Sequence, residues 1–142
     1  MPIALPHNDV GLAYSSTGDM VAHYQDRMMV PVPFVAATVD SNVYIAVMPC
    51  RVTAVRGVNT TIGGAGATAS IRKCTGTQAP SAGTLVHSTA IGGEVAINTV
   101  QSATLATSLE TLTLAAGDRL AIDIGGTLTA LVALIVIELQ PL

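Results

Sequence analysis

Beyond residue 33 the chain is a succession of short β-prone runs separated by turn residues. About nine runs follow one another at spacings of roughly 8–15 residues, and each ends at glycine, proline or small polar residues. No part of this region shows a sustained helical hydrophobic period. Because the connections are short, neighbouring runs are expected to pair mainly antiparallel. The predicted strands lie at residues 35–39, 42–48, 51–58, 67–74, 85–91, 94–100, 108–114, 119–124 and 130–137.

Regular short strands joined by Gly and Pro turns favour a sandwich or a barrel. The strand count fits a two-sheet jelly roll best. An immunoglobulin-like sandwich is the alternative, but the chain has no Trp and lacks the widely spaced pair of cysteines that is usual in that fold. We therefore predict an all-β fold: an antiparallel two-sheet jelly-roll sandwich of about 8–9 strands over residues 34–142, with an extended N-terminal arm over residues 1–33.

The last run, Ala130–Ile137, is apolar at every position. A membrane-spanning helix needs about 20 apolar residues, so this run is too short to be one. As a strand, this run would span roughly 26 Å at about 3.3 Å per residue. Alternation places Leu131, Ala133, Ile135 and Ile137 on one face and Val132, Leu134 and Val136 on the other. Since both faces are apolar, we expect the core to cover one face and a second subunit or the N-terminal arm to cover the other.

The composition indicates that little of the protein surface is made of charged, solvated side chains. Charged residues make up 11% of the chain, against about 25% in an average domain. One interpretation is a compact β domain rich in small residues, and the other is a subunit whose surface is largely covered by partners. We adopt the second. The net charge of −3 and the scattered basic residues argue against nucleic-acid binding, since only Arg72 and Lys73 are adjacent.

Residues 1–33 differ from the rest of the chain. They contain four of the seven prolines and no sustained alternation, which favours an extended arm. The spacing of Met20, Tyr24 and Met28 also fits a short helix over residues 19–29. The arm is too apolar for a solvated tail, so we expect it to lie on a protein surface. Its start lacks a basic region and a long apolar core, so no secretory signal is expected.

The residues that usually carry chemistry form no motif. His7, His23 and His87 do not lie at metal-binding spacings, so no metal or other cofactor is expected. Cys50 and His87 are the only conceivable thiol–base pair, and no G-x-S-x-G elbow is present. Cys50 and Cys74 are expected to be buried free thiols, although a disulfide is conceivable.

The acidic side chains of the β region are spread over separate strands and turns, and they are expected to be solvated. They include Glu94, Glu110, Asp118, Asp123 and Glu138. The glycine-rich stretch "IGGAGAT" lacks the G-K-[ST] ending of a phosphate-binding loop. The sequence therefore predicts a protein that is not an enzyme.

Two blocks of the β region resemble small virion proteins of tailed bacteriophages. "NVYIAVMPCRVTAVRGVNTT" resembles their opening hairpin, and "LAAGDRLAIDIGGTLTALVALIVIEL" resembles their closing pair of strands. The resemblance covers roughly residues 34–142. It implies a capsid cement protein of jelly-roll type, which decorates the outside of the head and clamps neighbouring major capsid protein subunits against the pressure of packaged DNA.

The resemblance also implies partners and a location. The partners would be the major capsid protein and a second copy of the chain, as a homodimer or alternatively a trimer, with no membrane and no direct nucleic-acid contact. The protein would be made in the host cytoplasm and would reside on the outer capsid surface of the virion. A tail or fibre accessory domain for receptor binding, or a small jelly-roll hydrolase, are the alternatives. The predicted interface residues are Ile3, Leu5, Leu12, Tyr14, Met20, Tyr24, Met28, Val132, Leu134 and Val136.

Overall fold

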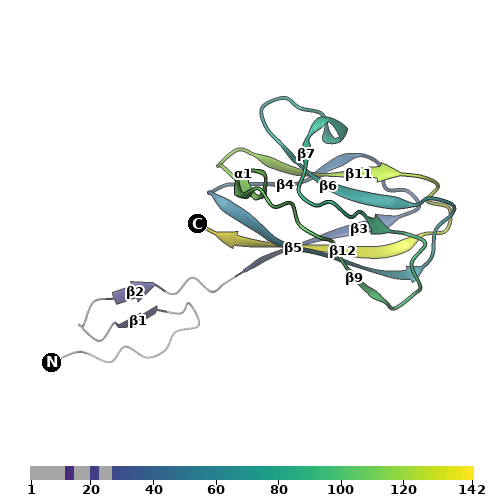
Figure 1. The fold of residues 1–142 in the computed structure, drawn as a ribbon, viewed down its shortest axis with the longest axis horizontal. Helices are drawn as coiled ribbons and strands as arrows, with labels where there is room; N and C mark the ends of the chain where they lie inside the picture. The colour runs from purple at the N-terminus through teal and green to yellow at the C-terminus, as the bar shows by residue number, and fades with distance from the viewer. Residues whose placement is uncertain (1–11, 15–19, 23–26) are drawn as a thin grey trace.

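The computed structural model describes residues 12–14, 20–22 and 27–142. Two antiparallel β-sheets pack face to face in an all-β sandwich, as the two layers in Figure 1 show. The first sheet has the order β10-β5-β12-β3, and β9 also pairs with β5. The second has the order β4-β11-β6-β7, and β8 also pairs with β6. The bounds are β3 Met28–Val35, β4 Ser41–Ile45, β5 Cys50–Thr61, β6 Thr68–Cys74, β7 Thr84–Leu85, β8 Ile91–Gly92, β9 Val100–Ser102, β10 Thr113–Leu114, β11 Arg119–Gly125 and β12 Val132–Pro141.

The order of the strands along the chain is that of a jelly roll. The chain places β3 in the first sheet, β4 in the second, β5 in the first, and β6 and β7 in the second. It then returns with β10 in the first sheet, β11 in the second and β12 in the first. Every pairing between neighbours is antiparallel. The predicted fold class is therefore confirmed.

The core fills the space between the two sheets. In β11, Leu120 and Ile122 are fully buried, and Ala121 between them is buried as well. The charged Asp123 faces away from the core and pairs with Arg72 at 2.7 Å. The largest fully buried side chains are Phe34, Ile71, Ile91, Leu114, Leu120, Ile122, Leu131, Ile135, Ile137, Leu139, Val52 and Val55.

Four predicted strands differ from the structure. Of residues 35–39, only Val35 belongs to a strand, the end of β3, and the rest form the turn and loop that follow it. Residues 108–114 form the helical turn α1, Leu109–Leu112, before the short β10, because the Ser108 hydroxyl caps it by accepting from the Thr111 amide. Residues 85–91 are divided between β7, a single bridge at His87 and β8. Most of 94–100 is a turn that precedes β9. The η1 turn, Pro80–Ala82, lies in the loop between β6 and β7.

The first strand of the sandwich begins earlier than the sequence indicated. β3 starts at Met28 and pairs with β12 along its whole length, so six residues assigned to the arm belong to the sheet. Pro31 and Pro33 are accommodated because β3 is an edge strand. The amide of Val35, which lies in the same alternation as these prolines, donates to Thr38 Oγ1 rather than to β12. The proline nitrogens therefore face the free edge, where no ladder bond is lost.

The described parts of the N-terminal segment are also extended. β1, Leu12–Tyr14, pairs antiparallel with β2, Met20–Ala22, in a separate two-stranded sheet. Met20 and Met28 both lie in strands, so the helix considered over residues 19–29 is wrong at the positions that the structure describes.

This boundary predicts how the chain tolerates truncation. Deletion of residues 1–26 leaves β3 intact, so the cooperative thermal transition of the sandwich is expected to remain. Deletion of residues 1–33 removes most of an edge strand and exposes the edge of β12, so a loss of the cooperative thermal transition is expected. Circular dichroism melting of both truncated chains measures the difference. Equal stability of the two would contradict the assignment of residues 28–33 to the sheet.

Candidate interaction surface

The face of the first sheet that points away from the core, here called the outer sheet face, carries exposed apolar side chains along β12 and its neighbours. β12 alternates as predicted, with Leu131, Ala133, Ile135 and Ile137 in the core. Val132 and Leu134 point outward and are 46% and 42% exposed, while Val136 is partly buried. Within the part of the chain that the structure describes, nothing covers this side of β12, so the expected cover is not supplied by the sandwich itself.

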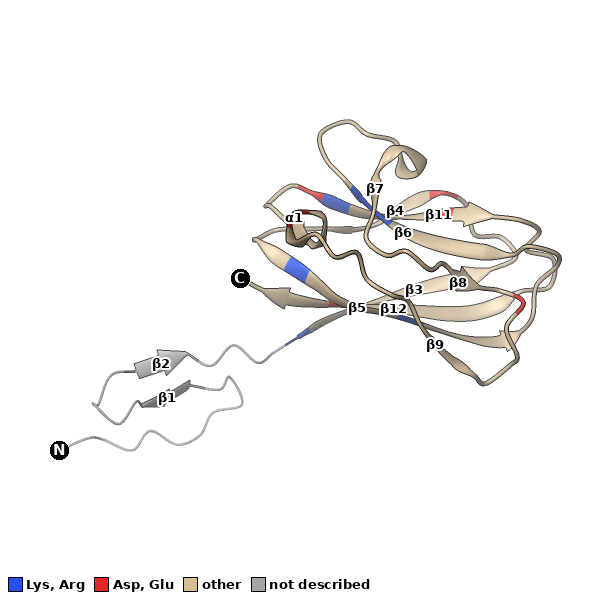
Figure 2. Ribbon diagram, in the orientation of Figure 1, with Lys and Arg blue, Asp and Glu red and all other residues tan. Residues whose placement is uncertain are grey.

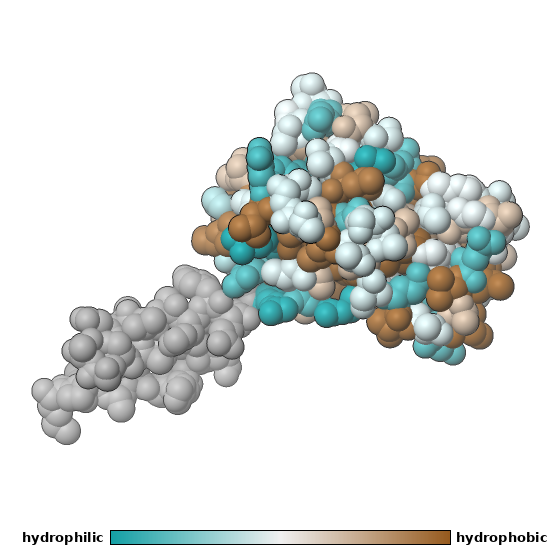
Figure 3. All heavy atoms as spheres, in the orientation of Figure 1, coloured by the Kyte–Doolittle hydropathy of each residue, from teal (hydrophilic) through white to brown (hydrophobic). Residues whose placement is uncertain are grey.

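Neighbouring strands extend the apolar strip on both sides of β12. The register places Pro33 beside Leu134 and Pro31 beside Val136. On the other side, β5 places Val58 beside Leu134, and β9 places Val100 beside Val58. A hollow of about 250 Å³ lies on this face, lined by Met29, Arg56, Gly57, Val58, Val100, Leu134 and Val136. Apolar atoms are visible at the lower right of the molecule in Figure 3, where β9 lies in Figure 1.

One end of the outer sheet face is charged. Glu138 is only 4% exposed, yet it lies on the outward side of β12. Its carboxylate accepts hydrogen bonds from Arg27, from Arg56 at 3.0 Å and from the Thr53 hydroxyl at 3.2 Å. The hydrogen bond from Arg27 is the largest of the causes that lower the pKa of Glu138, whereas burial opposes it. The expectation that this carboxylate is solvated is therefore wrong.

The charges at this end do not balance. Arg51 lies between the core residues Cys50 and Val52, so alternation turns its side chain toward the same outward face. Its Nε is buried and has no hydrogen-bond partner among the described residues. Three guanidinium groups, those of Arg27, Arg51 and Arg56, thus accompany the single carboxylate of Glu138. Figure 2 shows the basic segments on β3 and β5.

A second group of exposed apolar side chains, here called the end cluster, lies at one end of the sandwich. It consists of Met48, Pro49, Leu109 and Leu142, and the Leu142 amide donates to the Pro49 carbonyl at 3.1 Å. Leu109 and Leu142 are 60% and 59% exposed. A hollow of about 440 Å³ lined in part by Pro49 and Leu109 lies beside them. Apolar surface is also visible at the left end of the coloured sandwich in Figure 3.

The predicted interface residues are placed as follows. Ile3, Leu5 and Tyr24 lie outside the described residues. Leu12 and Tyr14 belong to β1 and Met20 to β2. Met28 begins β3 and packs partly against the core. The structure brings Val132, Leu134 and Val136 together on one face.

Sequence reasoning missed the partners of these residues on the outer sheet face. Met29, Pro31 and Pro33 alternate with the more buried Val30, Val32 and Phe34, and this alternation in "MMVPVPF" was a usable signal. The prolines favour an extended arm over a paired strand, which is why the prediction for residues 1–33 does not include β3. Val58 and Val100 carry no sequence signal, since only the pairing of β5 with β9 brings them together.

The surroundings of His87 give this side chain a structural role. It is 2% exposed, and its Nε2 accepts a hydrogen bond from the Ile71 amide at 2.8 Å. An imidazole that accepts at Nε2 is neutral and holds its proton on Nδ1. Burial is the main cause that lowers the pKa of His87. Among the residues that the structure describes, His87 forms no ion pair or hydrogen bond with a carboxylate or with Cys50.

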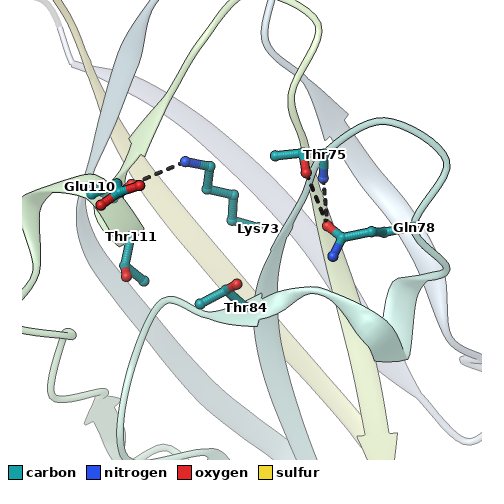
Figure 4. A pocket seen from close by; sticks show the side chains of 6 residues that line it. All are labelled: Lys73, Thr75, Gln78, Thr84, Glu110 and Thr111. Atoms are coloured by element: carbon teal, nitrogen blue, oxygen red, sulfur yellow. Dashed lines mark hydrogen bonds between the residues drawn. The ribbon is translucent and has the colours of Figure 1, made fainter.

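The cysteines and Lys73 are likewise held by the fold. Cys50 and Cys74 are free and buried, and burial raises the pKa of the Cys50 thiol. Lys73 lines a polar hollow of about 210 Å³ with Thr75, Gln78, Thr84, Glu110 and Thr111 (Figure 4). Its Nζ donates to the carbonyls of Glu110 and Thr113 and lies 3.8 Å from Asp118. The amine is therefore engaged with protein groups and does not offer an open anion site.

Two searches within the described ranges gave negative results. No group of three or more His, Cys, Asp or Glu side chains there is arranged to hold a metal ion. None of the helices in those ranges has the length and apolar character to span a membrane.

Comparison of the chain with protein-family models, with curated proteins and with solved structures found no match.

The Glu138 cluster predicts a pH dependence of stability. A folded-state pKa below the ordinary value means that the stabilisation is fully present above about pH 4.5 and is lost as the pH falls through the folded-state pKa. Glu138→Gln is expected to cost on the order of 1–2 kcal/mol at pH 7, because the two arginines that pair with it are half exposed. Urea unfolding of both proteins between pH 3 and 7 measures this, and a cost that persists unchanged at pH 3 would contradict it.

His87 predicts a second and separate dependence. Because its folded-state pKa is lowered, its contribution is complete above about pH 6.5 and declines as the pH falls below that value. His87→Gln keeps an acceptor for the Ile71 amide but does not titrate, so the decline between pH 6.5 and 5 should shrink. His87→Ala leaves the amide unpaired and should cost about 1–3 kcal/mol at pH 7.5. Denaturant midpoints at both pH values test the pair; a glutamine variant with the wild-type decline would refute the assignment.

Proposed function

We propose that the chain is a structural virion protein that binds the outer surface of a bacteriophage head and cements neighbouring major capsid protein subunits. The observation that carries the proposal is the presence of two separate apolar surfaces, the outer sheet face and the end cluster, on a jelly-roll domain with few charges. The similarity of residues 42–61 and 114–139 to phage cement proteins supplies the class of partner.

A protein that bridges subunits needs at least two binding surfaces, and their positions support such a role. The outer sheet face lies along the broad side of one sheet, whereas the end cluster lies where the β4–β5 loop, α1 and the C-terminal residue meet. Large apolar side chains exposed together on a monomer mark interaction sites. On a shell the same contacts repeat many times, so modest individual contacts become collectively strong.

The polar side chains described in the previous subsection also fit a protein that bridges capsid subunits. His87, Lys73 and Glu138, which would be the first candidates for chemistry, are all engaged in hydrogen bonds within the sandwich. Their bonds connect strands that are distant in sequence and so stabilise the fold under load. We assign the end cluster to the capsid, because its hollow is the larger of the two and its side chains project from loops.

The first test is the composition of purified particles. Density-purified heads of the phage that encodes the chain are expected to contain it at a fixed ratio to the major capsid protein, measured by quantitative mass spectrometry. Its recovery with tails or fibres instead would favour the receptor-binding alternative. Its absence from purified virions would overturn the proposal.

A second test uses point variants in the end cluster. Leu109→Asp and Met48→Asp place a charge in the proposed contact and are expected to weaken association with heads that lack the protein by at least about tenfold. Val39→Asp, at an exposed turn position outside both surfaces, is the matched control and should bind normally. Sedimentation of heads with bound protein measures the difference. Normal binding by both end-cluster variants would exclude this surface as the capsid contact.

A further inference from the structure

We propose that the outer sheet face is the docking site for residues 1–26 of a second copy of the chain. This inference stands on charge, register and chain length, and it does not depend on the assignment to a phage head. It makes the N-terminal segment an exchanged element that joins sandwich domains.

Charge complementarity selects this segment as the occupant. Residues 1–26 contain Asp9, Asp19 and Asp26 and no Lys or Arg, whereas the remaining 116 residues contain all six basic residues and six acidic ones. The negative net charge of the chain therefore resides in the N-terminal segment. The outer sheet face has the opposite imbalance, with three guanidinium groups and one carboxylate at its charged end. A second sandwich packed face to face would instead bring like charges onto the same surface.

The hydrophobic character of the segment matches the rest of the face. Its apolar residues include Ile3, Leu5, Val10, Leu12, Tyr14, Met20 and Val21. The face offers Leu134, Val58 and Val100 around its hollow, with Val100 67% exposed. Burying such side chains against each other gains roughly 25 cal/mol for each Å² of apolar surface removed from water. An acidic and apolar segment thus fits a surface that is apolar along the strip and basic at one end.

The strand topology favours docking of the segment on a second copy rather than on the sandwich of its own chain. β1 and β2 pair with each other and join neither sheet of the sandwich. A two-stranded ladder is marginally stable by itself in water and requires packing against another surface. Exchange between copies would pack this ladder against the outer sheet face, which no other described residue of the same chain covers.

The reach of the segment is sufficient. An extended chain advances about 3.3 Å per residue, so 26 residues span up to roughly 85 Å, and half that length if they double back as a hairpin. The ten residues of β12 span about 33 Å. The segment can therefore cross the whole face from its attachment at Arg27, where the ion pair with Glu138 anchors the point of exit.

The experiment measures self-association of the full chain. Sedimentation equilibrium is expected to show a concentration-dependent oligomer. Leu134→Asp should weaken that association by at least about tenfold, because it places a charge in the apolar hollow. The combined variant Asp9→Asn, Asp19→Asn and Asp26→Asn should weaken it by about threefold or more and reduce its dependence on salt. Val39→Asp is the control and should associate as the wild type does, while circular dichroism verifies that each variant is folded.

A labelled peptide provides the second measurement. A peptide of residues 1–26 is expected to bind the full chain in fluorescence anisotropy and to dissociate its oligomer, while a scrambled peptide of equal composition should bind at least about tenfold more weakly. A monomeric full chain at all concentrations would overturn the proposal. So would an oligomer that Leu134→Asp disrupts but that neither the asparagine variant nor the peptide affects, since the occupant would then be another sandwich.

Discussion

The structure depends on the packing of β12, a strand whose inward and outward sides both carry apolar residues. Its inward residues, such as Ile135 and Ile137, fill the centre of the core between the two sheets. Its ladder with β5 and β3 holds together the first and last strands of the jelly roll. A strand with only one apolar side would complete the fold equally well. The second apolar side, at Val132 and Leu134, is therefore surplus to the folding of a single chain and is available for association.

The buried polar side chains of the sandwich are few, and two of them, Glu138 and His87, have defined structural partners. Glu138 collects three donors on the outward side of β12, and His87 replaces a backbone acceptor for the Ile71 amide. In a domain with a low content of charge, such contacts contribute more to specificity than to the total free energy of folding. They also make the stability of the chain sensitive to pH in two separate ranges.

The fold class was predictable because period-2 alternation and turn residues act locally. Residues 67–74 and 119–124 alternate and became β6 and β11, while the runs rich in β-branched residues at 51–58 and 130–137 became β5 and β12. Residues 108–114 alternate less clearly, and the hydroxyl of Ser108 selected a helical turn instead. The prolines at positions 31 and 33 concealed β3, because the sequence does not reveal which strand will lie at an edge. Half of the candidate surface was likewise predictable: the alternation of β12 identified Val132, Leu134 and Val136.

The sequence by itself determined the β architecture, most of the long strands and the two apolar sides of the last one. Local alternation is sufficient for these features, since successive side chains of a strand always point to opposite faces. Only the tertiary structure decided which strands lie beside β12. That choice placed Pro33, Val58 and Val100 in one apolar strip and gathered Arg27, Arg51 and Arg56 around a single carboxylate. Such neighbours come from distant parts of the chain, and the pairing register that joins them has no local signal in the sequence.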